Sequence, residues 1–181
     1  MIKKIKILIV TVFLTAFGGV TYASFTDGLN AAIEGDYKTA LKEWQPLADQ
    51  GNASAQYNLG VRYENGKGVL KDDKQAVKWY QKAADQGHTS AQYNLGVMYE
   101  NGKGVLKDYK QAVKWYQKAA DQGYAGAQLN LGVMYANGEG VLKDLSKAKY
   151  WIKKAYENPG VSASTLGLAE KGWNQLELWK Y

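Results

Sequence analysis

The single histidine of the chain, His88, is followed two residues later by Ser90, so a serine–histidine pair is the first catalytic arrangement to consider. A serine nucleophile needs a base within hydrogen-bonding distance to activate it. In a repeat that the chain carries, the positions equivalent to His88 hold Asn52 and Tyr124. A position that accepts these three residue types favours an ordinary surface site at the start of a helix over a catalytic base.

Two glycine-rich segments have the composition of phosphate-binding loops. They are Gly66-Lys67-Gly68 and Gly102-Lys103-Gly104. A P-loop has two glycines at wider spacing, followed by Lys and Ser or Thr, and a dinucleotide-binding motif would need a third glycine where Lys71 stands. Because neither pattern fits, we expect these segments to reverse the chain between paired helices.

Carboxylate and cysteine side chains also give no catalytic or metal-binding pattern. Asp72 and Asp108 recur at the starts of predicted helices, where an aspartate caps the helix. The sequence has no cysteine, and no His/Cys/Asp cluster has the spacing of a metal site. An active site brings unlike groups together, whereas this chain repeats like groups at even spacing. We therefore predict a binding protein that is not an enzyme and has no cofactor or metal.

A repeat of 36 residues organises most of the chain, and a fixed period of this length is typical of solenoid proteins. The segments 52–87 and 88–123 are identical at 32 of their 36 positions. A third copy covers 124–160, and Asp36–Gly51 resembles the second half of a copy. The predicted organisation is therefore a leading unit at 24–51, three full repeats, and a C-terminal tail at 161–181.

Apolar residues within each repeat recur with helical spacing. The first half of repeat 52–87 has Ala55, Leu59 and Tyr63 at every fourth position. One hairpin of this length cannot bury its apolar stripe alone, so neighbouring hairpins must stack. The predicted fold is an all-α solenoid of tandem helical hairpins. In the second half of the repeat, one apolar face is made of Ala76, Trp79, Tyr80, Ala83 and Ala84.

The expected helix ends are marked by glycine and aspartate. Asn65-Gly66 ends the first helix, because both residues tolerate the left-handed conformation of a C-cap. Asp72, with Gln75 three residues later, predicts a capping box at the start of the second helix. The tail predicts a capping helix, with Gly172 as a candidate break, and its apolar residues are Leu166, Ala169, Trp173, Leu176 and Trp179.

Three short motifs recur in register over about residues 25–160: Ala-x-Ala-Gln-Tyr-Asn-Leu-Gly-Val-x-Tyr, Asn-Gly-Lys-Gly-Val, and Ala-Val-Lys-Trp-Tyr-Gln-Lys-Ala-Ala-Asp-Gln-Gly. This pattern resembles the Sel-one-like repeat family, relatives of the tetratricopeptide repeats. The resemblance implies a right-handed superhelix with a concave groove and an adaptor or scaffold role. It also implies the roles of exported bacterial members, which include regulators, envelope-assembly factors, host-interaction proteins and immunity proteins against secreted toxins.

Alignment with tetratricopeptide repeats places one face of each first helix in the concave groove. Tyrosine and apolar groups in a groove suit the anchoring of a peptide, although Tyr57 and Tyr93 are explained equally well by packing between repeats. The candidate partner-binding residues are Tyr57, Asn58, Val61, Glu64, Tyr93, Asn94, Val97, Glu100, Leu129, Asn130 and Val133. The other aligned positions are Ser54, Ser90, Gly126 and Ala136.

Lysines recur on the opposite face of the second helices, at every fourth position. A solvated outer face explains this spacing, and a surface that meets acidic partners or anionic envelope lipids is the alternative. This basic ridge consists of Lys74, Lys78, Lys82, Lys110, Lys114 and Lys118.

The first 23 residues are typical of a secretory signal peptide. Lys3, Lys4 and Lys6 precede an uncharged, mostly apolar run at 7–17, which is too short to span a bilayer. Thr21-Tyr22-Ala23 is a candidate cleavage site, and an uncleaved anchor is the alternative. Without this segment the net charge falls from +6 to +3, because three lysines are lost. Such a mild charge does not predict nucleic-acid binding.

These patterns together predict an exported protein, periplasmic or secreted, that binds a protein or peptide. The main hypothesis is an adaptor that holds its partner in the concave groove. An immunity protein that neutralises a secreted toxin, such as a phospholipase-type effector, is the first alternative. A hydrolase of cell-wall material is the second, and its activity would depend on His88.

Overall fold

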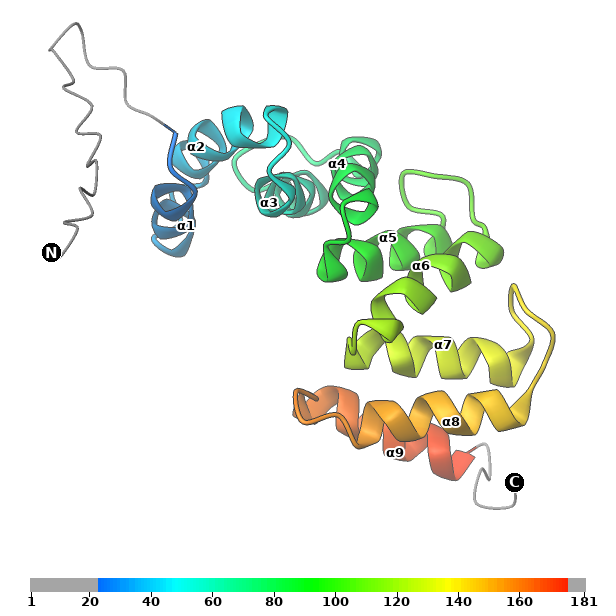
Figure 1. Ribbon diagram of the computed structural model, residues 1–181. Coiled ribbons are helices and arrows are strands. Elements are labelled where there is room, and N and C mark those ends of the chain that lie inside the picture. The colour runs from blue at the N-terminus through cyan, green and yellow to red at the C-terminus, as the bar shows by residue number, and fades with distance from the viewer. Residues whose placement is uncertain (1–22, 176–181) are drawn as a thin grey trace, which may run out of the picture.

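The computed structural model describes residues 23–175, and over this range the chain forms nine α-helices and no strand (Figure 1). The predicted signal peptide lies outside the described residues, except for Ala23. The helices are α1 (Phe25–Ile33), α2 (Tyr37–Asp49), α3 (Ala53–Asn65), α4 (Asp73–Asp85), α5 (Thr89–Asn101), α6 (Tyr109–Asp121), α7 (Ala125–Asn137), α8 (Leu145–Tyr156) and α9 (Ala163–Gln175).

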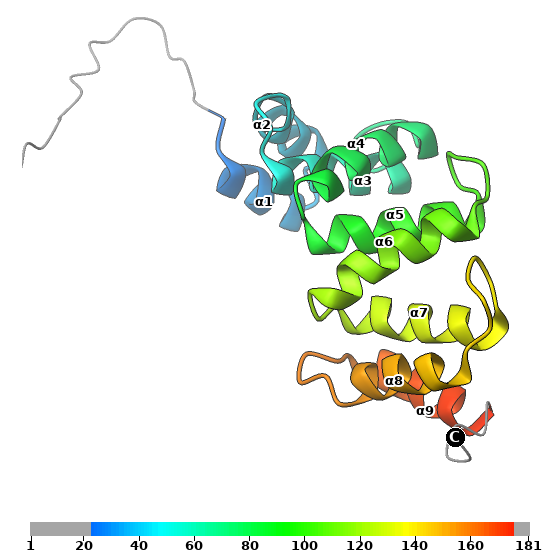
Figure 2. The same ribbon diagram turned by 45° about the vertical axis from the view of Figure 1, so that its right-hand side comes forward.

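The helices stack in chain order. Each helix packs against the one before it and the one after it, and α9 also contacts α7. Figures 1 and 2 show the hairpins stacked into a curved array, with α1 at one end and α8 and α9 at the other. The predicted all-α solenoid of tandem helical hairpins is therefore confirmed. None of the helices within residues 23–175 has the length and apolar character needed to cross a membrane.

The helix ends lie where glycine and aspartate indicate. Helix α3 ends at Asn65, and Gly66 follows in the left-handed conformation with φ of 65°. Helix α4 begins after Asp72, whose carboxylate accepts a hydrogen bond of 3.0 Å from the Gln75 backbone N–H. The Asp72 N–H donates to the Tyr63 carbonyl at 2.9 Å. Because the Asp72 N–H is already bonded to Tyr63, it does not need the Gln75 side chain as an acceptor. Only the first half of the predicted capping box is formed, the bond from the Gln75 N–H to the Asp72 carboxylate.

A glycine in the first helix of each hairpin lets a large side chain of the second helix approach closely. A Cβ atom on Gly60 would lie 2.5 Å from the Tyr80 ring, and one on Gly96 would lie 2.6 Å from Tyr116. Both tyrosines have no exposed area. Truncating such a buried aromatic to alanine costs about 3–5 kcal/mol. The two helices of a hairpin are therefore held at close range by a glycine–aromatic contact.

A ladder of glutamines connects each repeat to the next, and the sequence analysis did not anticipate it. Gln56 is 4% exposed and donates to the Ala48 carbonyl at 2.9 Å. Its side-chain oxygen accepts a hydrogen bond of 2.7 Å from Gln86. Gln92 and Gln122 repeat the arrangement at 2.7 Å. The bond to Ala48 joins Gln56 to the preceding unit, whereas the Gln56–Gln86 and Gln92–Gln122 bonds lie within one repeat. Because a buried amide without a partner costs about 1–3 kcal/mol, these bonds favour one spacing within and between repeats.

The two ends of the array depart from the repeat. In the leading unit, Trp44 replaces the tyrosine and donates from its indole N–H to the Phe25 carbonyl at 3.2 Å. At the other end, α9 runs from Ala163 to Gln175 and continues through Gly172 without a break. The predicted tail residues Leu176 and Trp179 lie outside the described residues.

Candidate partner-binding surface

The predicted groove residues lie on α3, α5 and α7, the first helices of the three repeats. Two of the aligned residues are closely packed: Leu129 is 6% exposed and Ala136 is 2% exposed. The other candidate residues are half-buried, so their surfaces are shared between the core and solvent. They are Tyr57, Asn58, Val61, Glu64, Tyr93, Asn94, Val97, Glu100, Asn130 and Val133.

Each groove tyrosine packs against an aromatic ring of the next repeat. The Tyr57 ring lies 4.7 Å from the His88 ring, and the two planes differ by 19°. In the next repeat, Tyr93 lies 4.8 Å from Tyr124. Burial raises the pKa of both Tyr57 and Tyr93 above the usual value, so their hydroxyl groups stay protonated at neutral pH. These rings are rigidly positioned, and packing explains part of their role.

His88 caps a helix. Its Nδ1 atom accepts a hydrogen bond of 3.3 Å from the Ala91 backbone N–H at the start of α5. Asn52 does the same for Ala55 at the start of α3, at 2.9 Å. Burial lowers the pKa of His88, which favours the neutral ring that this acceptor role requires. Among the hydrogen bonds of residues 23–175, none joins His88 to Ser90, and the pair has no catalytic geometry.

The groove glutamates bond to the buried tyrosines of their own hairpins. The Tyr80 hydroxyl donates to a Glu64 carboxylate oxygen at 2.6 Å, and Tyr116 donates to Glu100 in the same way. Burial raises the pKa of Tyr80 well above its usual value, and the bond to Glu64 raises it further. Each glutamate therefore satisfies a hydroxyl group that would otherwise be buried without a partner.

Asparagines from the following repeat complete the polar contacts. The Asn94 side chain lies close to the hydroxyl groups of Tyr57 and Tyr80, and this polar neighbour partly offsets the rise in their pKa values. Asn130 has the same relation to Tyr93 and Tyr116. Two polar clusters result, which we call the groove clusters: Glu64, Tyr80, Asn94 and Tyr57 form the first, and Glu100, Tyr116, Asn130 and Tyr93 form the second.

The third repeat replaces this polar arrangement with an apolar one. Ala136 and Ile152 stand where the other repeats have the glutamate and the buried tyrosine. Both belong to one buried cluster that also contains Leu129 and Ala169 of α9. The simultaneous change of both partners is a signal that the sequence carries, and it could have revealed the Glu–Tyr bond. The polar part of the candidate surface therefore belongs to the first two repeats and the Asn130 position.

All six lysines of the basic ridge are exposed on α4 and α6. Lys82 lies 4.2 Å from the centroid of the Trp79 ring, and Lys118 lies 4.2 Å from that of Trp115. These are cation–π contacts with largely buried indoles. Lys82 and Lys118 thus cover core tryptophans, and this structural role accounts for their position without a partner. Lys74, Lys78 and Lys110 have exposed side chains on the same face.

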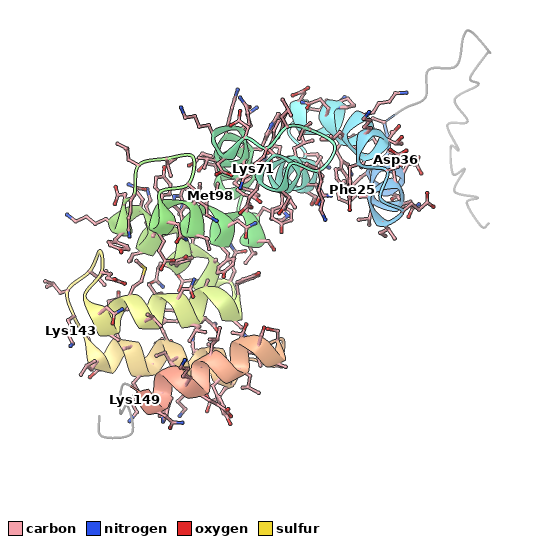
Figure 3. All side chains as sticks on the ribbon, turned by 180° about the vertical axis from the view of Figure 1, so that it is seen from behind. Phe25, Asp36, Lys71, Met98, Lys143 and Lys149 are labelled. Carbon is pink, nitrogen blue, oxygen red and sulfur yellow. The ribbon has the colours of Figure 1, made fainter. Side chains whose placement is uncertain are left out.

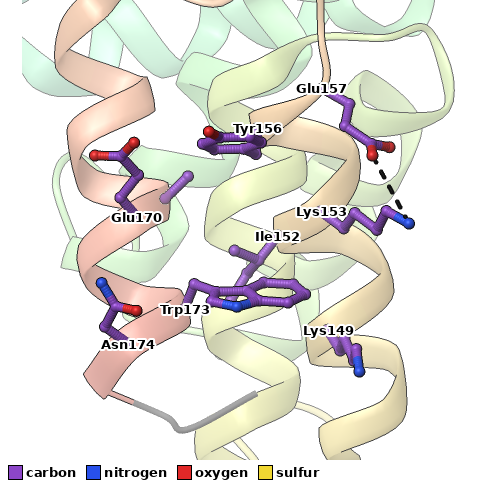
Figure 4. Close-up of a pocket in the computed structure, with 9 residues that line it drawn as sticks. Lys149, Ile152, Lys153, Tyr156, Glu157, Glu170, Trp173 and Asn174 are labelled. Atoms are coloured by element: carbon purple, nitrogen blue, oxygen red, sulfur yellow. Dashed lines mark ion pairs between the residues drawn. The ribbon is translucent and has the colours of Figure 1, made fainter. Parts of the chain in front are cut away.

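A cleft of about 680 Å³ lies between α8 and α9, away from the groove clusters (Figure 4). Ile152, Tyr156 and Trp173 form its apolar wall, and Lys153 pairs with Glu157 at 3.7 Å on its rim. Within the described part of the chain, no group of three or more His, Cys, Asp or Glu side chains could hold a metal ion. The cleft therefore combines an apolar wall with a rim on which the Lys153 and Glu157 charges partly neutralise each other.

Comparisons with known proteins converge on one repeat. The Sel1 repeat matches residues 53–88, 89–124 and 125–159. A crystal structure of a Sel1 repeat protein from Oxalobacter formigenes is 33% identical with a TM-score of 0.75, and the match covers 86% of this chain and 60% of that one. No curated protein matches the sequence.

Two further solved structures share the arrangement. A protective antigen with an SLR fold, present in uropathogenic Escherichia coli strains, is 38% identical with a TM-score of 0.62, and the match covers 78% of this chain and 33% of that one. Cysteine-rich protein B of Helicobacter pylori is 27% identical with a TM-score of 0.54, and the match covers 72% of this chain and 96% of that one. This chain therefore spans about a third to three fifths of the first two relatives.

Proposed function

Because the chain belongs to the Sel1 repeat family, we propose that it is an adaptor that binds a protein or peptide segment on the surface formed by α3, α5 and α7. Sel1 repeat proteins generally mediate protein–protein interactions, and their fold is generally a non-enzymatic scaffold. The proposal places the contact on the half-buried residues of the groove clusters, with Val61 and Val97 between them.

The observation that carries the proposal is the pair of groove clusters, repeated on successive helices. Each contains a half-buried tyrosine ring packed against an aromatic ring of the next repeat, with an asparagine close to its hydroxyl group. Side chains that are already held in place lose little conformational entropy when a partner binds. Tyrosine is also enriched among residues that dominate binding energies. Two such sites in register suit an extended segment that contacts both repeats.

We further propose that the protein acts after export, in the periplasm or outside the cell. The basic start and the apolar run at 7–17 support this. Cell fractionation followed by mass spectrometry of the N-terminus tests it. A mature chain that begins at Ser24 in the exported fraction is the expected result, and a full-length chain in the cytoplasm would contradict it.

A capture experiment tests the groove. The variant carries Tyr57→Leu and Tyr93→Leu, a change that the third repeat already makes with Leu129. Affinity for the captured partner should fall by about tenfold or more, while circular dichroism stays helical. The matched control carries Lys78→Gln and Lys114→Gln on the exposed ridge and should bind normally. Loss of binding in the lysine variant alone would move the site to the outer face.

A further inference from the structure

Three leucines stand almost fully in solvent at the same position of each repeat. Leu70 and Leu106 are both 91% exposed, and Leu142 is 90% exposed. Single exposed apolar residues are common on protein surfaces, but these three recur at 36-residue spacing on equivalent loops. The loops join α3 to α4, α5 to α6 and α7 to α8. We call this surface the loop edge.

The loops that carry these leucines are held in place by the fold. In the second repeat, Val105 packs against the core, while Leu106, the next residue, points to solvent. The Lys103 N–H donates to the Met98 carbonyl at 3.0 Å, and the Asp108 N–H donates to the Tyr99 carbonyl at 3.0 Å. The loop is therefore anchored at both ends, and its leucine is presented without a large entropy cost for ordering.

Each of the last two loops packs against the hairpin before it, so the leucines are presented along the same edge of the array. A Cβ atom on Gly104 would lie 2.2 Å from the Asp73 carbonyl oxygen, directly after the Leu70 loop. The same relation holds between Gly140 and Tyr109, at 2.3 Å. Figures 1 and 2 show the loops between α5 and α6 and between α7 and α8 projecting from one side of the array. Figure 3 shows Lys143 on the second of these loops.

The loop edge carries lysines beside the leucines and carboxylates at the helix starts. Exposed lysines flank the leucines, and the half-buried Glu139 takes the first of these positions in the third repeat. One of the lysines, Lys71, lies 3.8 Å from the Asp73 carboxylate. The carboxylates of Asp72, Asp108 and Asp144 accept bonds from backbone N–H groups at the helix starts, and those of Asp108 and Asp144 are half-buried. The exposed charges beside the leucines are therefore mostly cationic. The flanking lysines are Lys67, Lys71, Lys103, Lys107 and Lys143.

We propose that the loop edge docks onto a bilayer that contains anionic lipids. The leucines enter the interface between headgroups and acyl chains, and the lysines contact the anionic headgroups. A bilayer accepts isolated, protruding apolar side chains, whereas a protein partner needs a complementary pocket for each one. The three leucines belong to the loops, and none of them is part of a groove cluster. The inference therefore stands independently of the proposed adaptor function.

Site-specific fluorescence tests this proposal, because the chain has no cysteine of its own. Leu106→Cys carries an environment-sensitive dye in the full chain, and the probe is a vesicle of phosphatidylcholine with or without phosphatidylglycerol. The control is Asp121→Cys, which lies at the opposite end of α6, about 18 Å along the helix from the loop. The dye at position 106 should shift to shorter wavelength with the phosphatidylglycerol vesicles, and the dye at position 121 should not.

A second variant separates insertion from nonspecific adsorption. Adding Leu70→Ser and Leu142→Ser to the labelled Leu106→Cys chain should raise the lipid concentration at half-maximal shift by about tenfold or more. An absent shift, an equal shift at both labels or an equal shift with neutral vesicles would overturn the proposal. A shift that follows protein concentration without vesicles would identify a second copy as the occupant and would also overturn it.

Discussion

The hydroxyl group of Tyr80 donates a hydrogen bond of 2.6 Å to the carboxylate of Glu64, from the core of the first repeat to its groove face. The second repeat makes the same bond, and the third replaces both partners with Ala136 and Ile152. The groove and the core are therefore linked through one side-chain pair in each of the first two repeats. A change to one partner should affect folding as well as the surface.

A double-mutant cycle measures this link in the second repeat. Glu100→Ala alone leaves the buried Tyr116 hydroxyl without its acceptor and should lower the free energy of unfolding by about 1–3 kcal/mol. Adding Tyr116→Ile reproduces the pair found in the third repeat and removes the unsatisfied hydroxyl. The loss for the double variant should be smaller than the sum of the two single losses in urea unfolding. Additive losses would show that the bond has no energetic role.

Alkaline stability should depend on the buried tyrosines. Burial raises the folded-state pKa of Tyr80 and Tyr116 above the ordinary tyrosine pKa of 10.0, which holds in the unfolded chain. The unfolded state therefore releases protons first, and stability should be constant below about pH 10 and fall above it. Urea unfolding at pH values between 8 and 11 measures this fall in the free energy of unfolding.

The matched variant for this measurement carries Tyr80→Phe and Tyr116→Phe. This variant should be less stable at pH 8 and should lose less stability as the pH rises, because two hydroxyl groups of raised pKa are gone. Tyr57 and Tyr93, whose pKa values are also raised, account for the loss that remains. If the free energy of unfolding falls equally steeply with pH in both proteins, the account is contradicted.

Acid should weaken the His88 cap. Burial lowers the folded-state pKa of His88 below 6.5, so the unfolded chain binds a proton first as the pH falls. The stability supplied by the neutral ring is complete above about pH 6.5 and is lost as the pH falls through the folded-state pKa. Protonation of Nδ1 would also remove the acceptor for the Ala91 N–H.

His88→Asn is the natural control, because Asn52 already caps α3 in this way. Thermal melts between pH 5 and 7.5 should show a smaller decrease in melting temperature for the asparagine variant. If both proteins lose the same amount, carboxylate groups and not His88 set the acid sensitivity.

Helices and their caps follow from local patterns, and the sequence predicts them well. Apolar spacing locates α3 and α4, and Asn65-Gly66 and Asp72 mark their ends. The contacts between helices are less accessible, because their partners lie far apart in the chain. Tyr80 and Glu64 are 16 residues apart, and Gln56 and Gln86 are 30 apart, so no helical period connects them.

The candidate surface is likewise predictable in its helices but not in the contacts between repeats. The sequence predicts that Tyr57 and Tyr93 lie on the first helices of their repeats, but their packing against His88 and Tyr124 depends on how closely the repeats approach. The exposure of Leu70 is seen only in the structure, because the sequence suggests that an apolar residue beside Val69 is buried in the core.

Removing the repeat 88–123 as a block should leave a folded protein. The new junction joins Gly87 to Tyr124, and Tyr124 can stack on Tyr57 as it now stacks on Tyr93. The shortened chain should stay helical and melt at a lower temperature, because one repeat and one interface are lost.

Deleting residues 161–181 instead should have a larger effect for its length. Helix α9 packs with Leu129 and Ile152, and its loss would expose an apolar face that promotes association. A thermal melt and a sizing column compare the two deletions. Unfolding of the block deletion together with a monomeric, stable tail deletion would contradict the repeat boundaries.

The central claim is that a partner binds across α3, α5 and α7. Amide hydrogen exchange of the chain, with and without the captured partner, tests it most directly. The account predicts slower exchange in these three helices, most of all around Asn94 in α5 and Asn130 in α7, with α4 and α6 unchanged. Slower exchange confined to the lysine faces of α4 and α6 would contradict it.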